Sequence, residues 1–198
     1  MIAVDVEASG VNYQKHSILS VGAVDLSDPD SRFYGECRIW DGGSADPDTV
    51  VFLQMSENEM RLPSKQSESE LVHKFLSWII SKKQKIIVGQ NPSFDRDFLQ
   101  AAAFRAHLDW PLAYRTLDIH SIAVTHIIKS GGEIPLKENG NSALDLDAIL
   151  NYVGIPEEPV PHNALTGALC HAEVASRLLY GKKLLPEFDK FEMPKFSI

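Results

Sequence analysis

The chain has 198 residues, of which 44% are apolar, so its length and composition fit one domain with a single hydrophobic core. Its 27 acidic and 19 basic residues give a formal charge of −8, which excludes a basic body that coats nucleic acid. Two distant cysteines, no signal-peptide pattern and no apolar run of the roughly 18 residues of a spanning helix predict a soluble, cytoplasmic protein without disulfides, structural zinc or a membrane segment.

The first part of the chain favours β-structure. Runs rich in β-branched residues predict strands at residues 2–6, 17–26 and 32–40. Proline and aspartate at 27–30 favour a turn, so we expect the second and third strands to form a hairpin beside the first. Residues 46–60 mix apolar and acidic side chains and have only weak helical character.

The rest of the chain alternates helices with one short strand. Apolar side chains at helical spacing predict helices at residues 67–81, 117–129, 144–153 and 163–180. A strand at 86–88 precedes a further helix, which we expect to begin with Asn91 as N-cap and to continue to about His107. Glycine and asparagine at 130–142 predict a loop.

This order of elements predicts an α/β architecture. We expect a mixed sheet of about five strands with helices on its faces. The folded domain should cover residues 1–183, and residues 184–198 should form a C-terminal extension that packs on it.

Asp5 and Glu7 lie two residues apart on the first predicted strand. Their side chains therefore share one face of the sheet. Two buried like charges repel each other unless a cation lies between them. The pair taken alone fits two solvated acids near a strand end better than a cation site.

Three motifs resemble those of the DnaQ-like 3′–5′ exonucleases of the DEDDh type, which include oligoribonucleases and polymerase proofreading subunits. Residues 5–10 resemble the first motif, a strand-borne Asp-x-Glu followed by small residues and glycine. Residues 89–95 are similar to the second, in which asparagine precedes an aromatic residue and then the metal-binding aspartate. Residues 162–167 resemble the third, His-x-Ala-x-x-Asp, except that its last position is Gly167. The motifs follow the family's order, and the resemblance covers roughly residues 2–180.

The resemblance implies a ribonuclease H-like fold and metal-dependent release of nucleotides from the 3′ end of DNA or RNA. Asp5, Glu7 and Asp95 would hold two divalent ions, Mg²⁺ or Mn²⁺, because hard cations call for carboxylate oxygens. His162 would take a proton from the attacking water as general base. We expect the protein to bind nucleic acid 3′ ends and no membrane. The sequence leaves open whether it forms a homodimer.

The resemblance also implies where the terminal nucleotide would lie. The expected substrate-binding residues are Ala8, Ser9, Gly10, Asn91 and Phe94. Phe52, Leu53 and Met55 are further candidates for stacking on bases, although Phe52 and Leu53 fit core positions better.

Gly167 departs from the family pattern because it offers no side-chain ligand. His171 lies one helical turn further on the same face and is our candidate for a substitute metal ligand, whereas Glu173 is turned away. An ordinary polar role for His171, or a water in the gap, fits as well. We expect weak binding of the second ion, a need for high Mg²⁺ or a preference for Mn²⁺, and higher metal affinity in Gly167→Asp.

Two other functions fit the same residues. A catalytically weakened module that binds nucleic acid ends or a partner protein would follow from the loss of one ligand at Gly167. A hydrolase of small nucleotides would share the metal site but would have a closed pocket.

Overall fold

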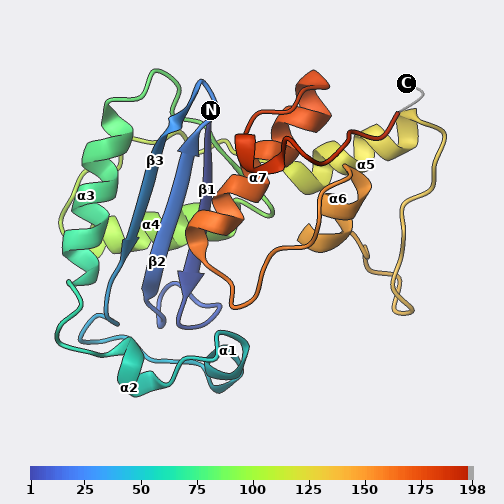
Figure 1. The fold of residues 1–198 in the computed structure, drawn as a ribbon. Coiled ribbons are helices and arrows are strands. Elements are labelled where there is room, and N and C mark those ends of the chain that lie inside the picture. The colour runs from blue at the N-terminus through green and yellow to red at the C-terminus, as the bar shows by residue number, and fades with distance from the viewer. Residues whose placement is uncertain (196–198) are drawn as a thin grey trace.

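The computed structural model describes residues 1–195, whose strands form one five-stranded mixed sheet in the order β3-β2-β1-β4-β5 (Figure 1). β1 pairs antiparallel with β2, which pairs antiparallel with β3, while β4 and β5 extend the sheet parallel to β1. The strands are β1 (Ile2–Ala8), β2 (Ile18–Asp25), β3 (Asp28–Glu36), β4 (Ile87–Gly89) and β5 (Leu117–Asp118). The predicted α/β fold with a five-stranded mixed sheet is confirmed.

Helices cover both faces of this sheet, and two short helices lie beyond the end of β1 at the bottom of Figure 1. The first face packs against α3 (Glu68–Ile80) and α4 (Ser93–Arg105). The second face packs against α5 (Ile119–Lys129), α6 (Leu146–Tyr152) and α7 (Ala164–Tyr180). The short helices beyond β1 are α1 (Pro47–Phe52) and α2 (Glu57–Met60), and a 3₁₀ turn, η1 (Pro186–Phe188), follows α7.

The side chains of β1 alternate between the two layers. Ile2, Val4 and Val6 belong to the core under α3 and α4, whereas Ala3 belongs to the core under α5, α6 and α7. Because side chains alternate along a strand, Asp5 and Glu7 fall on the Ala3 side, which faces α7. The strand therefore presents both acids to the helix that follows His162.

The start of α7 approaches the sheet very closely. A Cβ atom added to Gly22 of β2 would lie 2.0 Å from the carbonyl oxygen of Ala164, so only glycine permits this contact. Asn163 caps the helix, because its Oδ1 accepts a hydrogen bond from the N–H of Leu165 at 2.9 Å. Close packing and the cap together fix His162 next to the end of the sheet.

Several element boundaries differ from the predictions. β3 begins at Asp28 instead of residue 32, since an edge strand tolerates Pro29, and it ends at Glu36. Asn91 does not cap α4: its backbone has a left-handed φ of 49°, and the helix begins at Ser93. Residues 117 and 118 form β5 instead of a helical turn, and Asp118 then caps α5.

A buried ion pair ties the C-terminal segment to α7. The Arg177 Nε donates to Glu173 Oε1 at 2.7 Å, and both side chains are fully buried. The other Glu173 oxygen accepts hydrogen bonds from the backbone of residues 184 and 185, while Arg177 also donates to the carbonyl oxygens of Phe188 and Phe191.

Residues 196–198 of the predicted extension lie outside the described residues. No helix within residues 1–195 is long and apolar enough to cross a membrane.

Candidate active site

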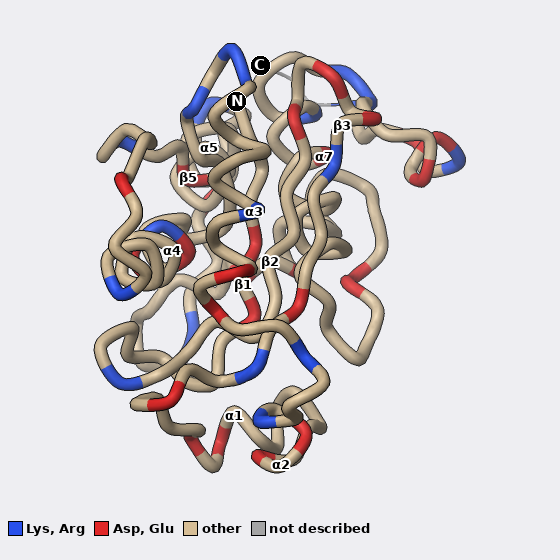
Figure 2. The backbone as a smooth tube through the Cα atoms, turned by 90° about the vertical axis from the view of Figure 1, so that its left-hand side faces the viewer, with Lys and Arg blue, Asp and Glu red and all other residues tan. Residues whose placement is uncertain are grey.

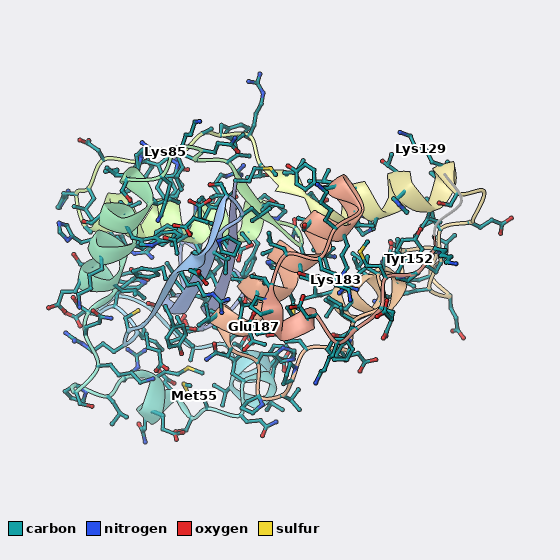
Figure 3. All side chains as sticks on the ribbon, turned by 45° about the horizontal axis from the view of Figure 1, so that its top comes forward. Met55, Lys85, Lys129, Tyr152, Lys183 and Glu187 are labelled. Atoms are coloured by element: carbon teal, nitrogen blue, oxygen red, sulfur yellow. The ribbon has the colours of Figure 1, made fainter. Side chains whose placement is uncertain are left out.

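A cleft of about 310 Å³ opens between the end of the sheet, the α1–α2 segment and the residues just before α7. Glu7 of β1 and His162 both line it, so the predicted acid and the predicted base face the same space. Tyr34, Met55 and Lys65 add aromatic, apolar and basic surface, and Figure 3 places Met55 at this end of the molecule.

Asp5 and Asp95 are the most strongly perturbed acids near this cleft. Burial is the main cause that raises the pKa of Asp5 well above its usual range, and the charges of Asp95, Glu7 and Glu158 raise it further. Burial also raises the pKa of Asp95, which is only 3% exposed, to about 8. The two carboxyl groups thus share one buried, negatively charged environment.

Two further acids belong to this environment: Glu7, which lines the cleft, and Glu158, which contacts His162. Burial raises the pKa of Glu7, and the Glu158 charge adds to the effect, whereas His162 opposes it. Burial likewise raises the pKa of Glu158, although the hydrogen bond from His162 lowers it in part. Glu158 belongs to no recognised motif and was missed by the sequence analysis. Its spacing of four residues before His162 was the only available signal.

In the described part of the chain, the three predicted cation ligands, Asp5, Glu7 and Asp95, lack a lysine or arginine partner. Buried carboxylates without a counter-charge suit a divalent cation, and one buried Glu158 oxygen has no hydrogen-bond partner at all. As placed, however, no three His, Cys, Asp or Glu side chains of the described chain are close enough together to hold an ion. The donor chemistry fits a cation, and the side chains have to shift toward it.

His162 is held from two sides. Its Nδ1 lies 3.2 Å from Glu158 Oε2, and its side chain is 24% exposed. The Phe52 ring stacks on the imidazole with centroids 5.0 Å apart and an angle of 16° between the planes. Because Phe52 is 60% exposed, its predicted core position is wrong, whereas Leu53 is buried as expected.

Gly167 lies directly against Asp5. A Cβ atom at position 167 would be 2.4 Å from Asp5 Oδ2 and 2.7 Å from its Cγ. The space in which a side chain at 167 would begin is therefore filled by the Asp5 carboxyl group. Asp5 occupies this space only because residue 167 is glycine.

The geometry disagrees with His171 as a metal ligand. The ring is buried against β1 and β4, where its Nδ1 lies 2.9 Å from the carbonyl oxygen of Val4. A carbonyl only accepts, so Nδ1 carries the proton and Nε2 accepts from the N–H of Gln90 at 3.4 Å. Both ring nitrogens are occupied by the main chain. We expected a preference for Mn²⁺ because of this nitrogen ligand, so the structure gives no reason to expect that preference.

We expect His171 to make the protein labile in acid. Burial lowers its pKa to about 4, whereas histidine in an unfolded chain titrates near ~6.5. Between these values the unfolded state binds more protons, so the free energy of unfolding falls as the pH drops through this window, by roughly 3 kcal/mol in all. Urea unfolding of wild type and His171→Gln at several pH values from 7 to 4 measures the effect. The variant should show the shallower decline, and identical declines would remove His171 as the cause.

The structure places most predicted substrate-binding residues in other contacts. The N–H of Ser9 donates to Ser17 at 2.8 Å, and Ala8 and Ser9 are buried. The His16 ring lies where a Gly10 side chain would be, so a nucleotide cannot use that space. Phe94 packs on Phe98 at 4.7 Å, and the N–H of Asn91 donates to Asp118. These contacts disagree with a direct role of residues 8–10 and Phe94 in holding a nucleotide.

Comparisons with known proteins agree with the fold and the motifs. The family model described as the 3′–5′ exoribonuclease Rv2179c-like domain matches residues 1–179. No curated protein matches the chain significantly. Escherichia coli exonuclease I in complex with a 5cy-dT13 oligonucleotide superposes with a TM-score of 0.70 at 17% identity, over 91% of this chain and 41% of that one. Exonuclease I from Methylocaldum szegediense gives 0.70 at 17% identity over the same shares of the two chains. The present chain thus spans about two fifths of the length of these exonucleases.

Proposed function

Because the chain belongs to the 3′–5′ exoribonuclease Rv2179c-like domain family, we propose that it hydrolyses RNA from the 3′ end with divalent cations. The observation that carries this proposal is the shared cleft of Glu7 and His162, with Asp5 and Asp95 within electrostatic reach of Glu7. A carboxylate cluster next to an imidazole can supply both cation ligands and a base for phosphodiester hydrolysis.

Asp5, Glu7 and Asp95 would hold the cations, Mg²⁺ or Mn²⁺. When bound, such ions stabilise the negative charge that develops on the phosphate oxygens during displacement. The chain's own contribution is a set of carboxylates whose burial and mutual repulsion favour a positive partner.

His162 would act on the attacking water. The Glu158 carboxylate accepts a hydrogen bond from Nδ1, so the neutral ring carries its proton there. The lone pair of Nε2 is then free to accept a proton. Stacking on Phe52 further limits rotation of the ring. The two contacts orient the base toward the cleft that it lines.

The terminal nucleotide would bind in the cleft itself. Its volume of about 310 Å³ lies at the lower end of the range for small-ligand pockets. Tyr34, Phe52 and Met55 offer surfaces on which a base can stack. Lys65 offers a positive charge to phosphate, although it also pairs with Glu36 at 3.3 Å. Figure 2 shows both charge signs interspersed along the chain, which agrees with local contacts to a short 3′ end.

Digestion of RNA and DNA oligomers of equal sequence, labelled at the 5′ end, tests the proposal. We expect Mg²⁺ or Mn²⁺ to produce a ladder that shortens from the 3′ end, faster on RNA, and EDTA to stop it. Binding without cleavage would contradict the proposal and favour the binding module that Gly167 suggests. Cleavage of short nucleotides alone would favour the small-nucleotide hydrolase.

Gly167→Ala isolates the steric effect at position 167. The new Cβ displaces the Asp5 carboxyl, so we expect Mn²⁺ to bind more weakly by on the order of tenfold. Alanine favours the helix by about 1 kcal/mol, so the fold should persist. Gly167→Asp brings the same conflict together with a new carboxylate, and it should bind better than Gly167→Ala but no better than wild type. Calorimetric Mn²⁺ titration of the three proteins measures this. Tighter binding by Gly167→Asp than by wild type would instead support the expectation from the sequence that an acid at position 167 raises metal affinity.

A further inference from the structure

Glu158 is a buried carboxylate of which the mechanism proposed above uses only one oxygen, the partner of His162. It lies in the segment between α6 and α7, where its N–H donates to Asp147 Oδ1 at 3.2 Å. Its side chain is only 6% exposed. One carboxylate oxygen, Oε2, meets His162 Nδ1, but the other, Oε1, is buried and has no hydrogen-bond partner.

An unpartnered carboxylate oxygen in the interior is costly, because it has lost water without gaining another donor. Within the described chain, the ion pair of Glu158 is with His162, and no lysine or arginine pairs with it. Glu158 instead contacts His162, which lines the same cleft as Glu7. The free oxygen therefore lies beside the cleft that one of the proposed cation ligands enters.

Position 167 cannot complete this environment from α7. Gly167 has no side chain, and the Asp5 carboxyl fills the space in which one would begin. Glu158 approaches from the preceding segment and needs no space on the helix.

We propose that Glu158 supplies the fourth carboxylate of the divalent-cation site, in place of the acid that is absent at position 167. This inference rests on the proposed function, because it requires that Asp5, Glu7 and Asp95 hold a cation. Oε1 would face the cation while Oε2 keeps its contact with His162. One carboxylate would then link the cation site to the base.

Mn²⁺ binding by the full chain, followed by electron paramagnetic resonance and calorimetry, tests the assignment without an activity readout. Glu158→Gln removes the charge and retains a hydrogen-bond acceptor for His162. Glu157→Gln is the matched control, because Glu157 is the exposed neighbour with the same chemistry. Asp5→Asn reports whether the signal comes from this site. We expect Glu158→Gln to weaken Mn²⁺ binding by about tenfold or more, and Glu157→Gln to match wild type.

The outcomes separate this inference from the proposed function. Mn²⁺ binding that Asp5→Asn weakens but Glu158→Gln leaves unchanged would overturn the role of Glu158 alone. Wild type that binds no Mn²⁺ would overturn both proposals. His162→Ala should keep Mn²⁺ affinity within about twofold of wild type, since Glu158 remains. If Glu158→Gln is too unstable for titration, the rise of its melting temperature with Mn²⁺ replaces the titration, and a rise as large as in wild type would contradict the role.

Discussion

Glu173→Gln should lower the free energy of unfolding by about 3–5 kcal/mol, because it leaves Arg177 as an unpaired charge in the interior. Both side chains are fully buried, with Arg177 Nε 2.7 Å from Glu173 Oε1. Glu173 also accepts the N–H groups of Leu184 and Leu185 through its second oxygen. The change therefore weakens both the ion pair and the attachment of the segment that follows α7.

Urea unfolding followed by circular dichroism measures this loss. Glu187→Gln is the matched control, because Glu187 pairs with Arg32 at 2.5 Å but its side chain is 42% exposed. A solvent-exposed pair contributes at most about 1 kcal/mol. Figure 3 labels Glu187 beside α7. Equal losses in the two variants would show that burial of the Glu173–Arg177 pair does not set its contribution.

His162→Ala should slow single-turnover RNA hydrolysis by about 10²- to 10⁴-fold, the usual contribution of a general base. The fold should persist, since His162 precedes α7 and is partly exposed. His73→Ala, an exposed position on α3, provides the control and should leave the rate unchanged.

A rapid-quench measurement on 5′-labelled RNA gives the rate of the chemical step directly. Circular dichroism of His162→Ala confirms that the variant is folded. A rate equal to that of wild type under these conditions would remove His162 from the mechanism.

Local patterns predicted the elements that depend on local physics. Alternation along β1 placed Asp5 and Glu7 on one face, and helical spacing gave α3 almost residue for residue. The predicted helix at 163–180 is α7 with Asn163 as its N-cap. Local patterns failed at Asn91, which was predicted as a helix N-cap. Its left-handed backbone follows from the chain path between β4 and α4.

The parts of the candidate site that the sequence did not predict depend on packing between distant segments. His171 contacts the carbonyl oxygen of Val4, which lies 167 residues away in the sequence, and the N–H of Gln90. Both ring nitrogens are therefore hydrogen-bonded to the main chain and do not face a cation. Glu158 is buried only because the segment before α7 folds against the acids. Ser9 hydrogen-bonds to Ser17 and Ser44, which no motif indicates.

We expect Asp5, Glu7 and Asp95 to form a divalent-cation site beside His162. Anomalous diffraction from crystals soaked in Mn²⁺ would locate the ion. We expect an anomalous peak at the end of β1, with carboxylate oxygens of these residues about 2.0–2.6 Å from the ion. The side chains should shift to reach it, because three of them do not yet surround one point. Carboxyl groups that stay more than ~10 Å apart in the soaked crystal, with no anomalous peak between them, would show that these residues form no cation site.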